Sequence, residues 1–302
     1  MDLTRRQFTC ALGSAALLLP WGCAKKPRAD RIGIALGGGG ARGLAHILML
    51  EVLDELGIQP YRISGTSIGA IVGVLYASGK SGREIRQLVD ELTVGSNESW
   101  FDALSEQRVL RWLAFLLPEL RRGGLLNPEG FINFLSETVG IKTFNELKIP
   151  LQVVATDFWK REAVALSSGE LMPAVQASMA LPGVSAAVEI NDRLLVDGGL
   201  VNPVPYDLIQ FESDFTIAVD VTGTRTPDDD QNPNYLDTTF DAFQILQTAV
   251  LREKMKHNPP NLYIRPEIRD VRVLEFYKFE AIFEQAQVKK DLLKRELERQ
   301  FG

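Results

Sequence analysis

The sequence is poor in the residue types that build metal centres and covalent cross-links. Its 302 residues include two Cys and two His. Two cysteines are too few for a disulfide framework or a cysteine-rich zinc site, and two histidines leave little for a histidine-based metal centre. No group of carboxylates has the spacing of a calcium-binding loop. We therefore expect neither a metal ion nor another cofactor.

The sequence also has no excess of positive charge. Lys and Arg number 33 against 39 Asp and Glu, a formal net charge of −6. Nucleic-acid-binding domains are usually basic, so nucleic acid is not an expected partner. With 45% hydrophobic residues, the chain has the composition of an ordinary globular protein with ample core. The sequence indicates no oligomeric state.

An apolar run near the N-terminus is too short to cross a bilayer. It occupies residues 10–19 and follows Arg5 and Arg6. A basic pair before a short apolar run is typical of an export signal, and these two arginines resemble a twin-arginine motif. We expect residues 1–22 to be a signal peptide, exported by either the twin-arginine or the general secretory route.

Cys23 ends this apolar region directly after Gly22. The pair resembles a bacterial lipoprotein cleavage site, which predicts lipidation of Cys23 and a polar tether over residues 23–30. Pro20 and Trp21 depart from the pattern of such sites, so plain secretory cleavage and an uncleaved anchor are the alternatives. Lipidation would make this an exported, membrane-anchored protein facing the periplasm, with the outer membrane as the expected location.

From residue 31 onward, short apolar runs alternate with stretches of helical periodicity. This alternation predicts an α/β fold, namely a three-layer sandwich with a largely parallel central sheet. The expected strands are 32–36, 61–64, 151–156 and 215–221, the expected helices are 43–56 and 70–77, and the expected hairpin arms are 162–166 and 193–196.

A candidate nucleophile, Ser67, lies where a strand is expected to meet a helix. Gly65 and Gly69 flank it in a G-x-S-x-G sequence. Such a turn strains the serine backbone and exposes its hydroxyl, and bulky neighbours would collide with the adjoining elements. The dipole of the following helix favours negative charge at the serine. Ser67 is thus the expected nucleophile of a turn of this kind.

A glycine-rich loop follows the first expected strand. It comprises Gly38, Gly39, Gly40, Ala41, Arg42 and Gly43. Its unobstructed N–H groups suit an anion, so it can be an oxyanion hole for Ser67, a nucleotide-phosphate loop, or only a tight turn. The acidic residue that a dinucleotide fold places after its second strand is missing, and so is the Lys-Ser/Thr ending of a P-loop.

A third motif supplies a carboxylate. Asp197 ends an expected hairpin arm and precedes Gly198 and Gly199. Asp before two glycines is commonly a turn residue. Serine esterases usually need a histidine base, but His46 belongs to the helix after the glycine loop and is interpreted as structural. His257 has the chain order of an α/β-hydrolase histidine, yet no strand leads it into a site.

These motifs together resemble the patatin-like phospholipases, a family of lipid acyl hydrolases with a Ser-Asp dyad. The resemblance covers residues 31–221 and includes the blocks 177–183 and 197–205; residues 184–187 depart from it. It implies that Ser67 is the nucleophile, Asp197 its base, and the glycine loop the oxyanion hole. Phospholipids or lysophospholipids are the implied substrates, with a broad carboxylesterase or thioesterase as the alternative.

We expect three parts after the tether. Residues 31–221 form the patatin-like catalytic domain, 222–234 a linker-like loop, and 235–302 a C-terminal helical region packed on that domain. Residues 100–126 are rich in large apolar side chains and basic residues. They predict either a buried helical pair or a lid that contacts lipid at the mouth of the site.

Overall fold

The computed structural model describes residues 31–93, 129–226 and 235–302. The expected signal peptide, tether and Cys23 lie outside the described residues. So do the apolar segment 100–126 and most of the expected linker, residues 227–234. Within the described ranges, no helix combines the length and the apolarity needed to cross a membrane.

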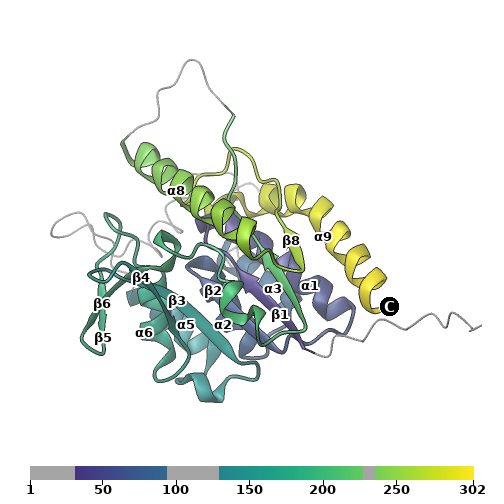
Figure 1. Ribbon diagram of the computed structural model, residues 1–302, viewed down its shortest axis with the longest axis horizontal. Helices are drawn as coiled ribbons and strands as arrows, with labels where there is room; N and C mark the ends of the chain where they lie inside the picture. The colour runs from purple at the N-terminus through teal and green to yellow at the C-terminus, as the bar shows by residue number, and fades with distance from the viewer. Residues whose placement is uncertain (1–30, 94–128, 227–234) are drawn as a thin grey trace, which may run out of the picture.

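One mixed sheet organises the described residues (Figure 1). Its strand order is β5-β6-β3-β2-β1-β7-β8, and β4 pairs with the other edge of β3. The central pairs β3-β2-β1-β7-β8 are parallel, whereas the β3-β4 and β5-β6 hairpins and the β3-β6 pair are antiparallel. The strands are β1 Ile32–Leu36, β2 Arg62–Thr66, β3 Leu151–Asp157, β4 Glu162–Leu166, β5 Val188–Ile190, β6 Arg193–Asp197, β7 Phe215–Val219 and β8 Leu262–Ile264.

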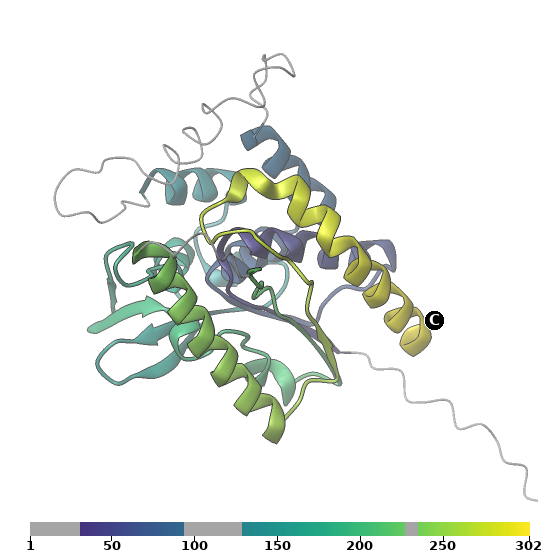
Figure 2. The same ribbon diagram turned by 90° about the horizontal axis from the view of Figure 1, so that it is seen from above.

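Helices cover both faces of this sheet (Figure 2). Side chains alternate across strand β1: Ile34 and Leu36 pack into the main core with helices α1, α2 and α9, whereas Ala35 packs toward α7 and α8. This is the expected three-layer α/β architecture. The helices are α1 Ala45–Glu55, α2 Ile68–Ala77, α3 Gly82–Thr93, α5 Glu129–Val139, α6 Leu171–Ser178, α7 Asp207–Gln210, α8 Tyr235–His257 and α9 Phe279–Phe301.

The C-terminal region takes part in the sheet as well as covering it. Strand β8, which the sequence analysis did not predict, extends the sheet beside β7. Helix α9 packs on α1, and the Nζ of Lys290 lies 2.6 Å from the Oε2 of Glu51 at this contact. Thr222 and Gly223, at the start of the expected linker, are buried. Residues 224–226, the rest of the described part of that loop, are exposed.

Strand β3 brings two distant chain segments together on one edge. Its first half pairs with β2, up to Thr66 opposite Val154. Its second half pairs with β6, beginning with Asp197 opposite Ala155. Because β2 and β6 run toward this point from opposite directions, the residues at their ends become neighbours. Ser67 follows β2 directly, so the sheet itself places Ser67 beside Asp197.

Candidate active site

Ser67 occupies the turn between β2 and α2, where the sequence analysis placed it. It caps the N-terminus of α2 with φ 55° and ψ −123°. A residue with a side chain rarely adopts such angles, and the strain costs on the order of 1–3 kcal/mol. The free N–H groups of the first turn of α2 favour negative charge at this point. The turn therefore holds a strained serine at the positive end of a buried helix.

The two flanking glycines are required by close packing. A Cβ on Gly65 would lie 2.5 Å from the backbone oxygen of Gly69 and 2.7 Å from the Cα of Ala70. A Cβ on Gly69 would collide with the backbone oxygen of Leu36 at the end of β1. The sharp turn thus brings α2 so close to the strand ends that neither position has room for a side chain.

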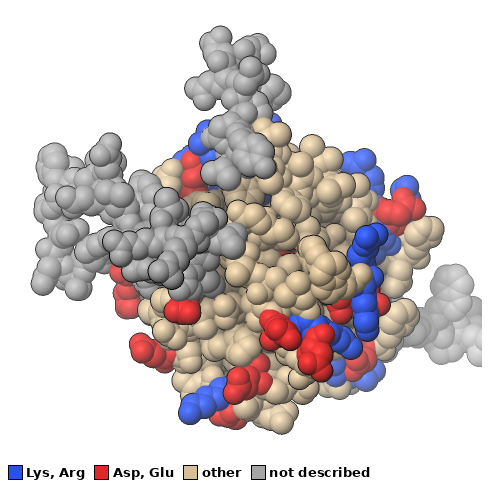
Figure 3. All heavy atoms as spheres, turned by 90° about the vertical axis from the view of Figure 1, so that its left-hand side faces the viewer, with Lys and Arg blue, Asp and Glu red and all other residues tan. Residues whose placement is uncertain are grey.

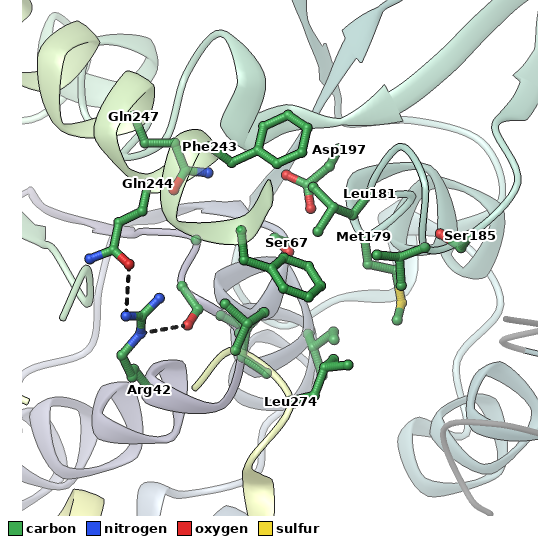
Figure 4. Close-up of a pocket in the computed structure, with 18 of the residues that line it drawn as sticks. Arg42, Ser67, Met179, Leu181, Ser185, Asp197, Phe243, Gln244, Gln247 and Leu274 are labelled. Atoms are coloured by element: carbon green, nitrogen blue, oxygen red, sulfur yellow. Dashed lines mark hydrogen bonds between the residues drawn. The ribbon is translucent and has the colours of Figure 1, made fainter. Parts of the chain in front are cut away.

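Asp197 is the last residue of β6 and is 4% exposed. Its Oδ1 accepts the N–H of Gly199 at 2.7 Å, and its own N–H donates to the backbone of Ala180 at 2.9 Å. Gly198 packs so tightly on the backbone of Val154 that a side chain would collide there. These contacts hold the carboxylate in place, and Figure 4 shows it pointing toward Ser67.

Burial changes the acidity of this carboxyl. Loss of water contact raises the pKa of Asp197 from 3.8 to about 6. Hydrogen bonding from Gly199 N–H and from the Ser67 side chain partly offsets that rise by favouring the charged form. The carboxylate is therefore more basic than a solvated one and is still ionised at neutral pH. This is the state that accepting a proton from a serine requires.

The glycine loop lies directly beside Ser67. A Cβ on Gly38 would come within 3.5 Å of the Ser67 Cβ, and a Cβ on Gly39 would collide with the backbone of Val221. The absence of side chains lets the loop backbone line the space over the serine. Because the loop lies beside Ser67, its interpretation as an oxyanion hole is favoured over its interpretation as a tight turn with no binding role.

The expected oxyanion segment, Gly38–Gly43, is too broad. The N–H groups of Gly38 and Ala41 donate to backbone carbonyls of neighbouring loops at 2.9 and 2.7 Å, so they are already used. In the part of the chain that the structure describes, the N–H groups of Gly39 and Gly40 have no such acceptor. The structure narrows the available donors to these two glycines.

Two further members of that segment have a packing or support role. Gly43 packs against Ile68, where a Cβ would collide. The side chain of Arg42 is buried behind the loop, with Nε donating to the Gly39 oxygen at 3.2 Å and Nη1 to Gln244 Oε1 at 2.9 Å (Figure 4). Burial lowers the pKa of Arg42 to about 10, so it remains charged. Arg42 thus ties the glycine loop to helix α8.

Ser178, at the end of α6, is a site residue whose role the sequence motifs did not indicate. Its hydroxyl accepts the N–H of Ser67 at 2.9 Å and donates to the Val154 oxygen at 2.6 Å. It therefore links the backbone of the strained serine to β3. Its sequence signal was its place in block 177–183 of the family resemblance, and that block did not indicate what the serine does.

A cavity opens over Ser67 between the glycine loop and helix α8, and most of its lining is apolar. Val184 and Ser185, where the sequence departs from the family resemblance, lie on its wall. Among the described lining residues, Arg42 is the only cation. The apolar lining side chains are Ile68, Ile71, Phe131, Met179, Leu181, Val184, Phe240, Phe243, Val273, Leu274 and Phe276.

Neither histidine lies in a position to act on Ser67. His46 is fully buried, its Nε2 is 2.8 Å from the Gly37 oxygen, and burial lowers its pKa to about 4. It supports the glycine loop, which is consistent with the structural role that the sequence suggested. His257 is exposed at the end of α8, 3.2 Å from Glu253, and is absent from the described cavity lining. In the same described ranges, no three His, Cys, Asp or Glu side chains converge to hold a metal ion.

The fold and site define a class of α/β protein with a strained serine at a strand-helix turn, facing a buried carboxylate under a glycine loop. Residues 34–209 match the family model described as patatin-like phospholipase. The match covers more than half of the chain. The chain belongs to the patatin-like phospholipase family.

Two proteins of known sequence and one solved structure illustrate what this chain is similar to. An uncharacterized NTE family protein of Mycobacterium tuberculosis is 36% identical over 206 residues, which cover 68% of this chain and 53% of that protein. Lysophospholipase NTE1 of Saccharomyces cerevisiae is 28% identical over 83% of this chain and 16% of that protein. The crystal structure of VipD from Legionella pneumophila aligns with 88% of this chain at 16% identity and a TM-score of 0.47. This chain spans about half the length of the mycobacterial relative and 16% of the length of the yeast relative.

Proposed function

We propose that this protein is a serine lipid acyl hydrolase that cleaves fatty acyl esters of phospholipids or lysophospholipids. The buried carboxylate Asp197 beside the strained Ser67 carries the proposal. The apolar cavity over Ser67 suits a fatty acyl chain, and membership of the patatin-like phospholipase family supports this reaction class. The lysophospholipase name of the yeast relative favours the same substrates.

In the first step, Ser67 becomes acylated. Asp197 accepts the hydroxyl proton as Ser67 Oγ attacks the ester carbonyl carbon, and the carbonyl oxygen gains negative charge. The N–H groups of Gly39 and Gly40, together with the N-terminus of α2, stabilise that oxyanion. When the tetrahedral intermediate collapses, the ester bond breaks and the leaving alcohol takes the proton from Asp197. The fatty acyl group is now an ester of Ser67.

In the second step, water releases the fatty acid. Asp197 takes a proton from the attacking water, the same donors hold the second oxyanion, and Ser67 recovers its proton as the acyl ester breaks. The ordinary acidity of a solvated aspartate would make it a poor base for both steps. A pKa of about 6 makes Asp197 a better one while leaving it ionised at neutral pH.

A labelling experiment tests the proposal. The purified protein is treated with a fluorophosphonate probe, and the labelled residue is identified by peptide mass spectrometry. The products released from mixed phospholipids, lysophospholipids, simple carboxylic esters and acyl thioesters are then measured. We expect the label on Ser67 and fatty acid from the lipids. A probe that leaves Ser67 unmodified would refute an esterase of any kind.

A broad carboxylesterase or thioesterase on the same site is the alternative. It would give the same labelling of Ser67 but hydrolyse small esters or thioesters in preference to lipids. The nucleotide-binding interpretation of the glycine loop predicts instead that a nucleotide stabilises the protein thermally while Ser67 stays unlabelled. The product profile and a melting curve with added nucleotide separate these outcomes.

We also propose that the protein is exported and anchored to a membrane by a lipid on Cys23. The N-terminal pattern is the support for this proposal, and these residues lie outside the described ranges. Mass spectrometry of the N-terminal peptide from a bacterial host with lipoprotein processing tests it. A lipid-modified N-terminal Cys23 is expected, and the Cys23→Ser variant should lose both the lipid and the membrane fraction.

A further inference from the structure

A second cavity adjoins the one over Ser67. It lies among helices α1, α2, α3 and α5, and its described lining is apolar throughout. Five residues line both cavities: Ile68, Ile71, Phe131, Met179 and Phe276. The two cavities therefore share one wall. Ser67 lines the first cavity, and the end of the second cavity near Leu75 is called the deep end.

One face of helix α2 runs along both cavities. Ile68, Ile71, Val72 and Leu75 all line the second cavity and recur at the spacing of a single helical stripe. Ile68 is the neighbour of Ser67, whereas Leu75 lies two turns further along. At a rise of 1.5 Å per residue, the stripe extends roughly 10 Å from the serine.

The chemistry of the deep end selects its occupant. Leu75, Ile85 and Leu135 are among its described lining residues, and no polar side chain joins them. A phosphate or sugar head group would lose its hydration there without gaining a hydrogen bond, which costs several kcal/mol. An alkyl chain loses nothing polar and gains apolar contacts along the whole stripe.

We propose that this second cavity is the acyl-chain site, and that its depth sets the length of acyl chain the enzyme prefers. The inference rests on the proposed function, because it needs an acyl ester at Ser67. With the ester carbonyl at the serine, the chain runs along the α2 stripe from Ile68 toward Leu75. The alcohol part of the substrate then lies on the other side of Ser67, toward Gln247 of α8.

Opposite changes in cavity size test this inference. Leu75→Phe fills the deep end and Leu135→Ala enlarges it. The kcat/KM values for the p-nitrophenyl esters of butyrate, laurate and palmitate are compared for each variant. We expect Leu75→Phe to lower the palmitate-to-butyrate ratio about tenfold, and Leu135→Ala to raise the palmitate-to-laurate ratio.

The matched control is Val139→Ala, one helical turn beyond Leu135 on α5. Val139 is also buried but is not among the residues lining the cavity. It should lose stability without changing either ratio. If Leu75→Phe and Leu135→Ala both keep the wild-type ratios while still hydrolysing esters, the acyl-site inference is wrong and the proposed function stands. A wild-type protein with no hydrolysis of any ester would instead overturn the proposed function.

An independent observation concerns the turn between β3 and β4. Phe158 and Trp159 are 44% and 74% exposed at its tip. Their rings contact edge to face, with centroids 4.9 Å apart. Lys160 and Arg161 follow them and are also exposed. Exposed aromatic rings next to cations are unusual on a protein surface that meets only water.

The turn is held in one shape. The Oδ1 of buried Asp157 accepts the N–H groups of Trp159 at 3.1 Å and Lys160 at 2.9 Å, and the N–H of Phe158 donates to Leu194 at 2.9 Å. Arg161 adopts a left-handed backbone with φ 59°. The aromatic pair is thus presented by a rigid hairpin, which lowers the entropy cost of binding with it.

The turn lies at the same end of the sheet as Ser67. It begins three residues beyond Ala155, where β3 meets Asp197, and this corresponds to roughly 10 Å at 3.3 Å per residue. In Figure 1 strands β3 to β6 lie on the left of the view. Figure 3 shows that side, where a broad central area carries few charged side chains and most charges lie around it.

We infer that the Phe158–Arg161 turn docks the protein on a phospholipid bilayer that contains anionic lipids. Phe158 and Trp159 enter the interface, which favours amphipathic aromatic rings, while Lys160 and Arg161 contact head groups. The Oε1 of Glu162 lies 3.9 Å from the Nζ of Lys160, but both side chains are exposed, so this ion pair is weak. The pair does not involve Arg161, which can still interact with head groups. Docking there brings the serine end of the sheet to the lipid.

Vesicle binding tests this surface, with the whole chain carrying Cys23→Ser so that no lipid at that position contributes. Sedimentation is measured with phosphatidylcholine vesicles with and without phosphatidylglycerol. We expect Phe158→Ser/Trp159→Ser to reduce binding to both vesicle types about tenfold or more. Lys160→Gln/Arg161→Gln should reduce only the extra binding that phosphatidylglycerol provides.

Phe211→Ser is the matched control. Phe211 is 86% exposed but follows α7 at the opposite end of the sheet, just before the start of β7. It should leave vesicle binding unchanged. Equal losses from the Phe211 and the Phe158/Trp159 variants, or unchanged binding in the latter, would overturn the docking inference. Loss of binding to a protein partner with vesicle binding intact would reassign the turn to a protein interface.

Discussion

Ser67 lies beside Asp197 because the ends of β2 and β6 pair with adjacent residues of strand β3. Thr66, just before Ser67, pairs with Val154, and Asp197 pairs with Ala155. Two strands that approach from opposite directions thus deliver the hydroxyl and the carboxylate to one point. The glycine loop follows β1, which pairs with β2, and this loop closes the space above the two side chains. The catalytic proposal depends on this arrangement of strand ends.

Ser67→Ala and Asp197→Asn should each abolish ester hydrolysis, because one lacks the attacking oxygen and the other lacks the base. A loss of at least about 1,000-fold in kcat/KM is expected for each. Initial rates with a lysophospholipid and circular dichroism of each variant provide the measurement. His257→Ala should retain nearly the wild-type rate, and an inactive but folded His257→Ala would mean that the Ser-Asp dyad is not the complete base system.

Activity should rise with pH through the pKa of Asp197. The carboxyl must be ionised to accept the proton, and burial raises its pKa to about 6. We therefore expect kcat/KM to increase about tenfold per pH unit below pH 6 and to level off above it, because kcat/KM reports groups of the free enzyme. A rate profile with a soluble ester tests this. A plateau extending to pH 4 would assign the base role to a group of lower pKa.

The same carboxyl should make stability depend on pH. Its pKa is about 6 when folded and near 3.8 when unfolded, so the folded state binds the proton more tightly. The resulting stabilisation is full below about pH 4 and is lost as pH rises through 6, a change on the order of 3 kcal/mol. Asp197→Asn, which keeps an acceptor for Gly199, should therefore gain stability relative to wild type at pH 8 but not at pH 4.

Urea unfolding of both proteins at the two pH values measures this difference. Comparing the two proteins at each pH cancels the contributions of the other titrating groups. An Asn variant with the same relative stability at both pH values would indicate that Asp197 is accessible to water in the folded protein.

Two glycines should respond differently to Ala. A Cβ at Gly38 meets its nearest atom, the Ser67 Cβ, at an ordinary 3.5 Å, whereas a Cβ at Gly69 collides with the Leu36 backbone. Gly69→Ala should cost about 3 kcal/mol or more, and Gly38→Ala no more than about 1 kcal/mol. Thermal melts measure both. Gly38→Ala should still lower the rate of ester hydrolysis, because its methyl group crowds the reacting serine. A melt of Gly69→Ala at the wild-type temperature would contradict the close approach at this turn.

The local motifs could be predicted from the sequence because each depends on neighbouring residues. A serine between two glycines, at the junction of an apolar strand and an apolar helix, specifies a sharp turn through backbone sterics alone. The alternation of strands and helices likewise predicted the layered α/β fold. Strand β8 was missed because its three residues are too few to show a period, and its partner β7 lies far along the chain.

Other features depend on contacts that no local pattern encodes. Which glycine N–H groups are free follows from the carbonyls that Gly38 and Ala41 meet across the fold. The support from Ser178 and Gln244 arises because separate helices reach the same turn and loop. The pKa of Asp197 depends on burial, which requires the rest of the protein to exclude water.

The amino-acid sequence by itself determined that this protein has a strained serine turn, a glycine loop, a carboxylate before two glycines, and no histidine well placed to serve as a base. The tertiary structure decided that Ser67 and Asp197 meet, that two glycines offer free donors, and that a second apolar cavity adjoins the first. The physical reason is the range of the interactions. Backbone sterics act between neighbours in the chain, whereas strand pairing and burial join segments that only the fold brings together.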